Sequence, residues 1–285
     1  SLLFGPIVDR FGHKALLLLS CLVVLLGLEG IAFFTSIPLL QVSIIGIGLG
    51  GGILNGETNA LVADISNEAE KGSRLSLLGA FYGIGALGIP VLLSFLSEYY
   101  SFEIILQGTG MVMLIGILFC LGIRFPAPKQ PQGFPIKEGL GLLKESSLLL
   151  LSFILFFQSG IEGVCNNWTT LYLGHTTSIP ERGALRALSC MVAGFTVARL
   201  LLVVLFKKIK QETVLRTSLI TAVVGFALLT FAPGFARAAI GMVLIGAGLA
   251  STFPVILSII GSRYASLSGT AFSVALVIAL IGQTL

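Results

Sequence analysis

The sequence predicts an all-α integral membrane protein. Nine apolar stretches of about 18 to 27 residues fill most of the 285-residue chain, and one helical crossing of a bilayer needs about 20 such residues. Hydrophobic residues make up 55% of the chain and charged residues only 11%, whereas about a quarter of a soluble domain is charged. The spans are predicted to be helices because lipid offers no partner to the open edge of a strand.

The predicted helices follow one another with short polar connections between them. We expect them near residues 15–34, 41–65, 75–96, 102–123, 148–173, 183–206, 214–231, 236–260 and 267–285. The longest connection, from Arg124 to Glu145, contains four prolines and several lysines and separates four spans from five. This pattern predicts a first helical bundle over residues 1–124, a cytoplasmic linker over 125–146 and a second bundle over 147–285.

Basic residues in the connections predict the orientation of the chain. Most of the 17 Lys and Arg residues fall on one side once the chain is threaded back and forth, and the positive-inside rule places that side in the cytoplasm. We expect a multi-pass protein of the plasma membrane. The net charge of +4 is spread along these loops, so it does not require a nucleic-acid partner.

An internal repeat supports a division into two halves. Residues 9–17 and residues 207–215 are both basic loops that run directly into an apolar helix. When these two segments are aligned, Gly48 aligns with Gly246 and Gly50 with Gly248 in the spans that follow. Two halves that repeat in the same order are a known plan of secondary transporters.

A charged loop precedes the first complete span and carries a family resemblance. The segment GPIVDRFGHK at residues 5–14 resembles the Gly-x-x-x-Asp-Arg-x-Gly-Arg-Lys signature between the second and third helices of the major facilitator superfamily. The resemblance implies the fold of that superfamily, with two pseudo-symmetric helical bundles. In that register the first complete span is helix three and the last is helix eleven. We therefore expect a chain truncated at both ends, without helices one, twelve and most of two.

The same resemblance implies a conformational latch in this loop. Glycine permits a tight turn and a close backbone approach, and an aspartate can accept hydrogen bonds from amides at a helix N-terminus. His13 stands where the superfamily usually has Arg, so its contact is left open. Asp64, at the cytoplasmic end of the second complete span, is the predicted partner of Arg10. The predicted latch consists of Gly5, Asp9, Arg10, Gly12 and Asp64.

Four ionisable residues lie inside predicted spans, where each charge at the helix centre costs roughly 2.5 to 3.5 kcal/mol. Such residues usually face a bundle interior or a water-filled cavity, and proton relays are a common use. We predict proton coupling for Glu57 and Glu162; the alternative for Glu57 is a hydrogen bond to a neighbouring helix. We expect a structural use for Arg199, which would pair with a carboxylate, pair with helix C-terminal carbonyls or extend to the cytoplasmic surface. Glu29 lies near the outer end of its span.

Polar side chains near the two carboxyls predict a substrate cavity. Residues 55 and 59 lie one helical turn apart, and residues 158, 162 and 166 form a polar stripe. Trp168, the only tryptophan, stacks on a sugar-like ring in one interpretation and lies in the interfacial aromatic belt in the other. The predicted cavity residues are Asn55, Asn59, Gln158, Asn166 and Trp168.

Several segments also resemble the fucose-proton symporter family. Residues 156–173 are similar to its helix seven, and residues 246–258 and 268–273 are similar to its helices ten and eleven. The pair Glu57-Thr58 is similar to a Glu-Thr pair in its fourth helix, although the Asn-Pro that follows there is missing. Because that Asn-Pro is missing, the substrate of the family is not carried over to this chain. Glu57 and the polar stripe at residues 158, 162 and 166 lead us to predict a secondary active transporter, with proton-coupled uptake of a sugar or similar small polar solute by alternating access.

Two alternatives stay open for this fold. One is an exporter of hydrophobic or anionic metabolites, and the other is a transport-inactive nutrient sensor. We expect no enzyme, because no spacing of Ser, His and Asp or of metal ligands points to catalysis. The expected partners are a small-molecule substrate, protons and the lipid bilayer, with no nucleic acid, no metal and no cofactor. We expect a monomer.

Overall fold

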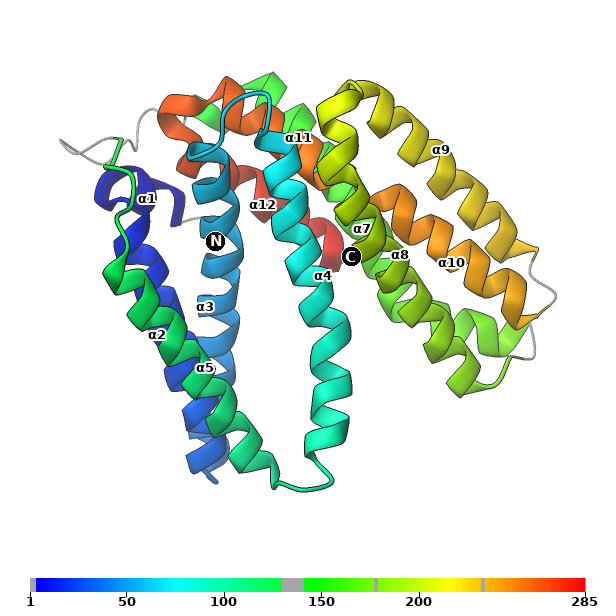
Figure 1. Cartoon of the computed structure of the whole chain (residues 1–285), viewed down its shortest axis with the longest axis horizontal. Helices are drawn as coiled ribbons and strands as arrows, with labels where there is room; N and C mark the ends of the chain where they lie inside the picture. Colours follow the sequence, from blue (N-terminus) through cyan, green and yellow to red (C-terminus); the bar gives the residue numbers. More distant parts are fainter. Residues whose placement is uncertain (1–3, 130–140, 177–178, 232–233, 285) are drawn as a thin grey trace. The chain divides into compact units, whose positions relative to one another are not determined.

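A computed structural model describes residues 4–129, 141–176, 179–231 and 234–284, and these residues form helices and connections without a strand (Figure 1). Nine segments among them are long and apolar enough to cross a membrane, which confirms the predicted fold class. Residues 130–140 of the predicted linker and Leu285 of the last predicted span lie outside the described residues.

The helices begin and end within a few residues of the predicted spans. Their bounds are α1 Phe4–Phe11, α2 His13–Phe33, α3 Ile37–Asp64, α4 Lys71–Leu96, α5 Phe102–Gly122, α7 Ser146–Thr176, α8 Glu181–Lys208, α9 Gln211–Thr230, α10 Phe235–Leu249, α11 Thr252–Arg263 and α12 Ser268–Thr284, with a short 3-10 turn at Ala265–Leu267.

Packing groups the chain into two compact units. The first contains residues 1–65, 89–145 and 264–274, and the second contains residues 66–88, 146–263 and 275–285. Helices α4 and α12 contribute residues to both units. The division at residues 124 and 147 therefore stays a prediction, and the two units are described separately below.

In the first unit α2 packs against α3 and α5. Small residues make the α2–α3 approach close: a side chain at Gly27 would reach the carbonyl of Ser43, and one at Gly50 would reach the carbonyl of Ser20. Van der Waals packing of this kind holds helices together in lipid, where apolar burial gives little net attraction between them.

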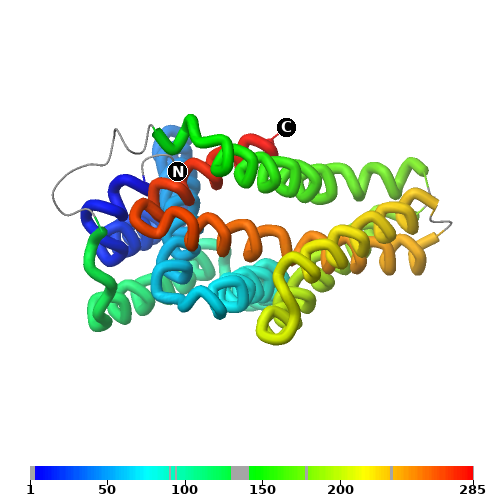
Figure 2. Tube along the Cα trace, turned by 90° about the horizontal axis from the view of Figure 1, so that it is seen from above, coloured from blue at the N-terminus to red at the C-terminus, as the bar shows by residue number. Residues whose placement is uncertain are grey.

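In the second unit α10 packs against α8 and α9, and Figures 1 and 2 both show α9 alongside α10. A side chain at Gly248 would meet Ala222 and the carbonyl of Ser218 on α9. Gly50 packs on α2 in the same manner. Gly50 and Gly248, which the repeat aligns, therefore occupy equivalent positions, because each packs against the helix that precedes its own.

The span predicted over residues 236–260 is interrupted near its middle. Helix α10 ends at Leu249 and α11 begins at Thr252, two residues before Pro254. Proline lacks an N–H, so the carbonyl four residues earlier loses its helical donor. Gln158 of α7 donates from Nε2 to the carbonyl of Leu249 at 3.0 Å, which satisfies one backbone acceptor at this break.

Candidate functional site

The motif loop is a tight turn between α1 and α2. Gly12 adopts φ = +80°, a left-handed conformation that favours glycine, and its N–H donates to the carbonyl of Val8 at 2.8 Å. A side chain at Gly5 would collide with the backbone of Gly269 and with Ser273. A residue with a side chain would therefore be strained at position 12 and would clash at position 5.

Asp9 binds the first turn of α12. Its carboxylate accepts hydrogen bonds from the N–H of Gly269 at 3.2 Å and from the N–H and hydroxyl of Thr270 at 2.9 and 2.7 Å. Burial raises the pKa of Asp9, and the bonds from Thr270 and Gly269 and the charge of Lys129 only partly oppose this. A helix N-terminus favours an anion, so the contact fits the predicted role of Asp9.

Replacing Asp9 with alanine is expected to loosen the first turn of α12. Two backbone amides and one hydroxyl would lose their acceptor, at a cost of about 1 to 3 kcal/mol. Hydrogen–deuterium exchange should be faster in peptides covering residues 268–273, and the apparent Tm should fall. Arg124→Ala, at an exposed position of the same unit, is the control, and an unchanged exchange rate in Asp9→Ala would contradict the contact.

Asp64 is the centre of a second group of bonds in the first unit. One carboxylate oxygen accepts from Lys129 Nζ at 2.7 Å and from the hydroxyl of Ser268 at 2.8 Å, and Lys129 also donates to that hydroxyl. The other oxygen lies 3.0 Å from Nε2 of His13. The pairing of Asp64 with Arg10 stays a prediction; the guanidinium of Arg10 lies 5.0 Å from the ring centre of Phe11.

Glu57 is fully buried and is joined to Asp64 through His13. Nδ1 of His13 lies 2.8 Å from Oε1 of Glu57, and the side chain of Glu57 is 0% exposed. The second oxygen, Oε2, is buried without a hydrogen-bond partner in the described part of the chain. The imidazole of His13 thus bridges the two carboxyl groups of α3, Glu57 and Asp64.

Sequence reasoning did not identify the partners in this bridge. The signal was present, since residues 57 and 64 are two helical turns apart and face the same way, and His13 of the motif begins α2. The bridging bonds connect residues 44 and 51 positions apart, however, and only tertiary structure brings those together. Lys129 was assigned to a linker and given no role.

The two predicted cavity asparagines of α3 contact each other. Asn59 donates to the backbone carbonyl of Asn55 at 2.7 Å and lies 3.3 Å from its side-chain oxygen. Asn55 is exposed and Asn59 half-buried, whereas Glu57 between them is buried, as helical spacing requires. Their role in substrate binding stays a prediction.

The polar stripe of α7 belongs to the second unit. Gln158 is buried at the α10–α11 break, Glu162 is half-buried, and Asn166 is exposed. Trp168 is 59% exposed, so neither interpretation of this residue is decided. Glu162 interacts electrostatically with Arg199 of α8, but no ion pair within 4.0 Å joins them in the described residues.

The second unit also has a polar cluster where α4 begins and α11 ends. Lys71, which is only 3% exposed, donates to Glu68 at 2.8 Å and to the hydroxyl of Ser262 at 3.1 Å. The hydroxyl of Ser262 in turn bonds Glu68. The hydrogen bond from Lys71 lowers the pKa of the Glu68 carboxyl. The cluster holds the start of α4 against the end of α11.

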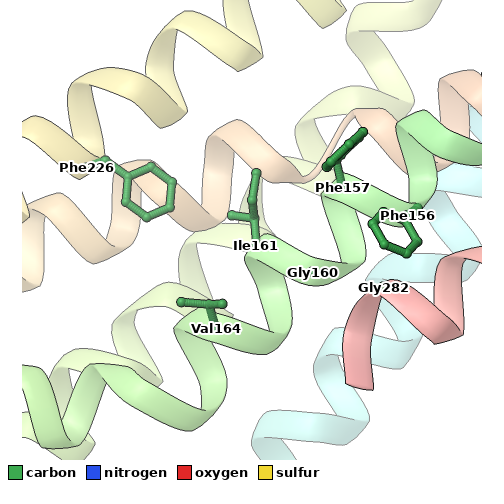
Figure 3. A pocket seen from close by; sticks show the side chains of 7 residues that line it. All are labelled: Phe156, Phe157, Gly160, Ile161, Val164, Phe226 and Gly282. Carbon is green, nitrogen blue, oxygen red and sulfur yellow. The ribbon is translucent and has the colours of Figure 1, made fainter. Parts of the chain in front are cut away.

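An apolar pocket of about 340 Å³ lies between α7, α9 and α12 of the second unit. Figure 3 shows its lining, which includes Phe157, Ile161, Val164, Phe226 and Gly282. No titratable side chain lines it. This pocket is therefore distinct from the polar cavity that the sequence predicts.

Comparisons with known proteins agree with this architecture. The sequence model described as Major Facilitator Superfamily matches residues 1–285. An uncharacterised MFS-type transporter of Bacillus subtilis, YfkL, is 26% identical over 214 residues, which is 72% of this chain and 53% of that protein. The chain thus spans about half the length of the curated relative it matches.

Solved structures share the fold. A variant of the E. coli fucose:proton symporter FucP matches with a TM-score of 0.82 at 19% identity, over 98% of this chain and 77% of FucP. FucP in the outward conformation matches with a TM-score of 0.80 at 20% identity over the same shares. The human organic anion transporter MFSD10 matches with a TM-score of 0.76 at 16% identity, over 98% of this chain and 72% of that one.

The helical fold of the described residues, with its nine candidate spans, is that of a multi-spanning membrane protein. The chain belongs to the Major Facilitator Superfamily, as the motif at residues 5–14 predicted.

Proposed function

We propose that this protein is a proton-coupled secondary transporter that takes up a sugar or similar small polar solute by alternating access. The observation that carries the proposal is the fully buried carboxyl of Glu57 in contact with His13. We further propose that the protein lies in the plasma membrane as a monomer. We place its basic loops in the cytoplasm because most of the Lys and Arg residues fall on one side of the predicted spans.

The Glu57–His13 pair can hold one proton in two ways. With Glu57 ionised and His13 protonated, both ring nitrogens donate, one to Glu57 and one to Asp64. If the proton moves from Nδ1 to Oε1, the protonated carboxyl donates to neutral imidazole and the second ring N–H still donates to Asp64. Neither arrangement breaks a hydrogen bond, so proton transfer within the pair needs little rearrangement.

A carrier uses such a pair by changing its access to water. The unpartnered Oε2 of Glu57 is the atom through which the pair would contact water or a solute hydroxyl when the surroundings open. Loading of the proton would then permit solute binding on one side, and release after reorientation would reset the carrier. This sequence of steps gives Glu57 the coupling role and His13 a relay role.

Support for the solute class comes from two sources. Both FucP structures share the fold over nearly the whole chain. Asn55 and Asn59 offer amide groups suited to hydroxyl recognition, and with Gln158, Asn166 and Trp168 we keep them as the proposed cavity residues. We keep Glu162 as a second proposed proton-coupling residue because it is half-buried within α7.

One observation favours the alternative of an anionic solute. Arg199 lies inside α8 with a buried Nε that has no hydrogen-bond partner in the described residues. An exporter of anionic metabolites would use such a cation, and the fold is also that of the organic anion transporter MFSD10.

Uptake into proteoliposomes tests the proposed function. The full-length protein should accumulate a labelled solute from a panel of sugars and small acids when the lumen is alkaline, and a protonophore should abolish accumulation. Uptake that responds to neither protonophore nor external pH would contradict proton coupling. Binding without any transport would indicate a sensor instead.

A further inference from the structure

Arg199 is held in a defined orientation within α8. Its guanidinium carbon lies 4.3 Å from the centre of the Phe195 ring, and Nη1 packs so closely on Gly79 of α4 that a side chain there would overlap it. The hydroxyl of Ser76 donates to the backbone carbonyl of Arg199 at 2.8 Å. One face of the guanidinium is therefore covered by an aromatic ring, as in cation–π pairs.

The guanidinium makes no hydrogen bond within the part of the chain that the structure describes. Nε is buried and unpartnered, and no carboxylate lies within 4.0 Å. Glu162 of α7 and Tyr82 of α4 interact with Arg199 only over longer distances. Arginine cannot lose its charge in proteins, and a buried cation is normally paired. The guanidinium is thus fixed in its orientation but has no hydrogen-bond acceptor in the described residues, and a ligand can supply that acceptor.

We propose that Arg199 binds the carboxylate of a small monocarboxylate solute. A guanidinium presents its donors in a planar fork that matches a carboxylate, and Nε of this fork has no hydrogen-bond partner in the described residues. This proposal rests on the proposed transport function, and it specifies the chemical class of the transported solute. A sugar acid combines a carboxylate for Arg199 with hydroxyl groups for the amides of α7.

Glu162 restricts the solute further. When it is ionised, the carboxyl of Glu162 on α7 would repel a second negative charge on a ligand bound at Arg199. A dicarboxylate is therefore disfavoured relative to a monocarboxylate. The competing interpretation is that Glu162 itself moves to pair with Arg199, which would make both residues structural.

Ligand binding to the purified full-length protein in detergent tests this proposal. Benzoate and gluconate serve as monocarboxylate probes, benzyl alcohol and glucose as neutral counterparts, and phthalate as a dicarboxylate. Calorimetry or thermal-shift titration should show binding of benzoate or gluconate that exceeds that of the matched neutral compound by roughly tenfold or more. Phthalate should bind more weakly than benzoate.

Variants separate a binding role from a structural one. Arg199→Gln should abolish carboxylate binding, and Arg199→Lys should weaken it roughly tenfold because the bidentate geometry is lost. Glu162→Gln should strengthen binding. The double variant Arg199→Gln with Glu162→Gln restores charge balance and should still not bind. Arg186→Gln, an exposed arginine of the same helix, is the matched control.

Three outcomes would overturn the proposal. They are equal binding of neutral and carboxylate probes, full carboxylate binding by the double variant, and loss of binding in Arg186→Gln to the same extent. Binding of carboxylates does not depend on proton coupling. Carboxylate binding without proton-driven uptake would therefore count against the proposed function alone, and proton-driven uptake of neutral sugars only would count against the role of Arg199 alone.

Discussion

Glu57→Gln is expected to abolish proton-driven accumulation while solute exchange continues. Glutamine matches glutamate in shape and can keep a hydrogen bond to His13, but it cannot bind and release a proton in this pH range. Accumulation against a gradient should fall to the level set by equilibration. Counterflow exchange, in which labelled solute outside replaces unlabelled solute inside, should retain most of its rate.

The control for this variant is another carboxyl of the same unit. Glu29→Gln alters a half-buried glutamate of α2 that packs against Gly110 of α5, at the predicted outer end of its span. It should accumulate solute at close to the unmodified level. If Glu57→Gln still accumulates solute under a pH gradient, Glu57 does not carry the coupled proton.

Two variants of His13 are expected to separate its contribution to stability from its role in proton coupling. His13→Ala leaves two buried carboxyl groups of α3 without their shared partner, and losing one member of a buried pair costs about 3 to 5 kcal/mol. The apparent Tm should fall markedly. His13→Arg, which restores the residue usual at this motif position, should fold well but lose proton-driven accumulation, because its charge is permanent.

Two measurements distinguish these effects. Thermal unfolding in detergent reports stability, and accumulation across a series of external pH values reports coupling. Lys14→Gln removes the neighbouring cation, which donates to the carbonyl of Leu121 at 2.8 Å, and it should leave the pH profile unchanged. A pH profile of His13→Arg that matches the unmodified protein would contradict the relay role.

Hydropathy was sufficient to predict the spans, because lipid imposes a minimum apolar length on each of them. It could not reveal the interruption between α10 and α11, since the residues on both sides are equally apolar. The signal was Pro254, whose missing N–H weakens the preceding turn. The hydrogen bond from Gln158 of α7 to the carbonyl of Leu249, where α10 ends, joins residues 91 positions apart and is not encoded by any local pattern.

The candidate site was predictable in its local parts only. The i, i+4 spacing predicted that Asn55 and Asn59 would share a face, and helix electrostatics predicted that Asp9 would accept from a helix N-terminus. Which helix supplies those amides, and which base bridges Glu57 and Asp64, depends on contacts between segments far apart in the chain. Those contacts follow from the packing of whole helices.

The carboxylate of Asp64 ties together three parts of the first unit that lie far apart in the chain. Its Oδ1 accepts from Lys129 and its Oδ2 lies 3.0 Å from Nε2 of His13, so the start of α2, the end of α3 and the residues after α5 share one anion. A neutral residue at position 64 would leave donors on both neighbouring segments without their acceptor, and the damage would spread beyond α3 itself.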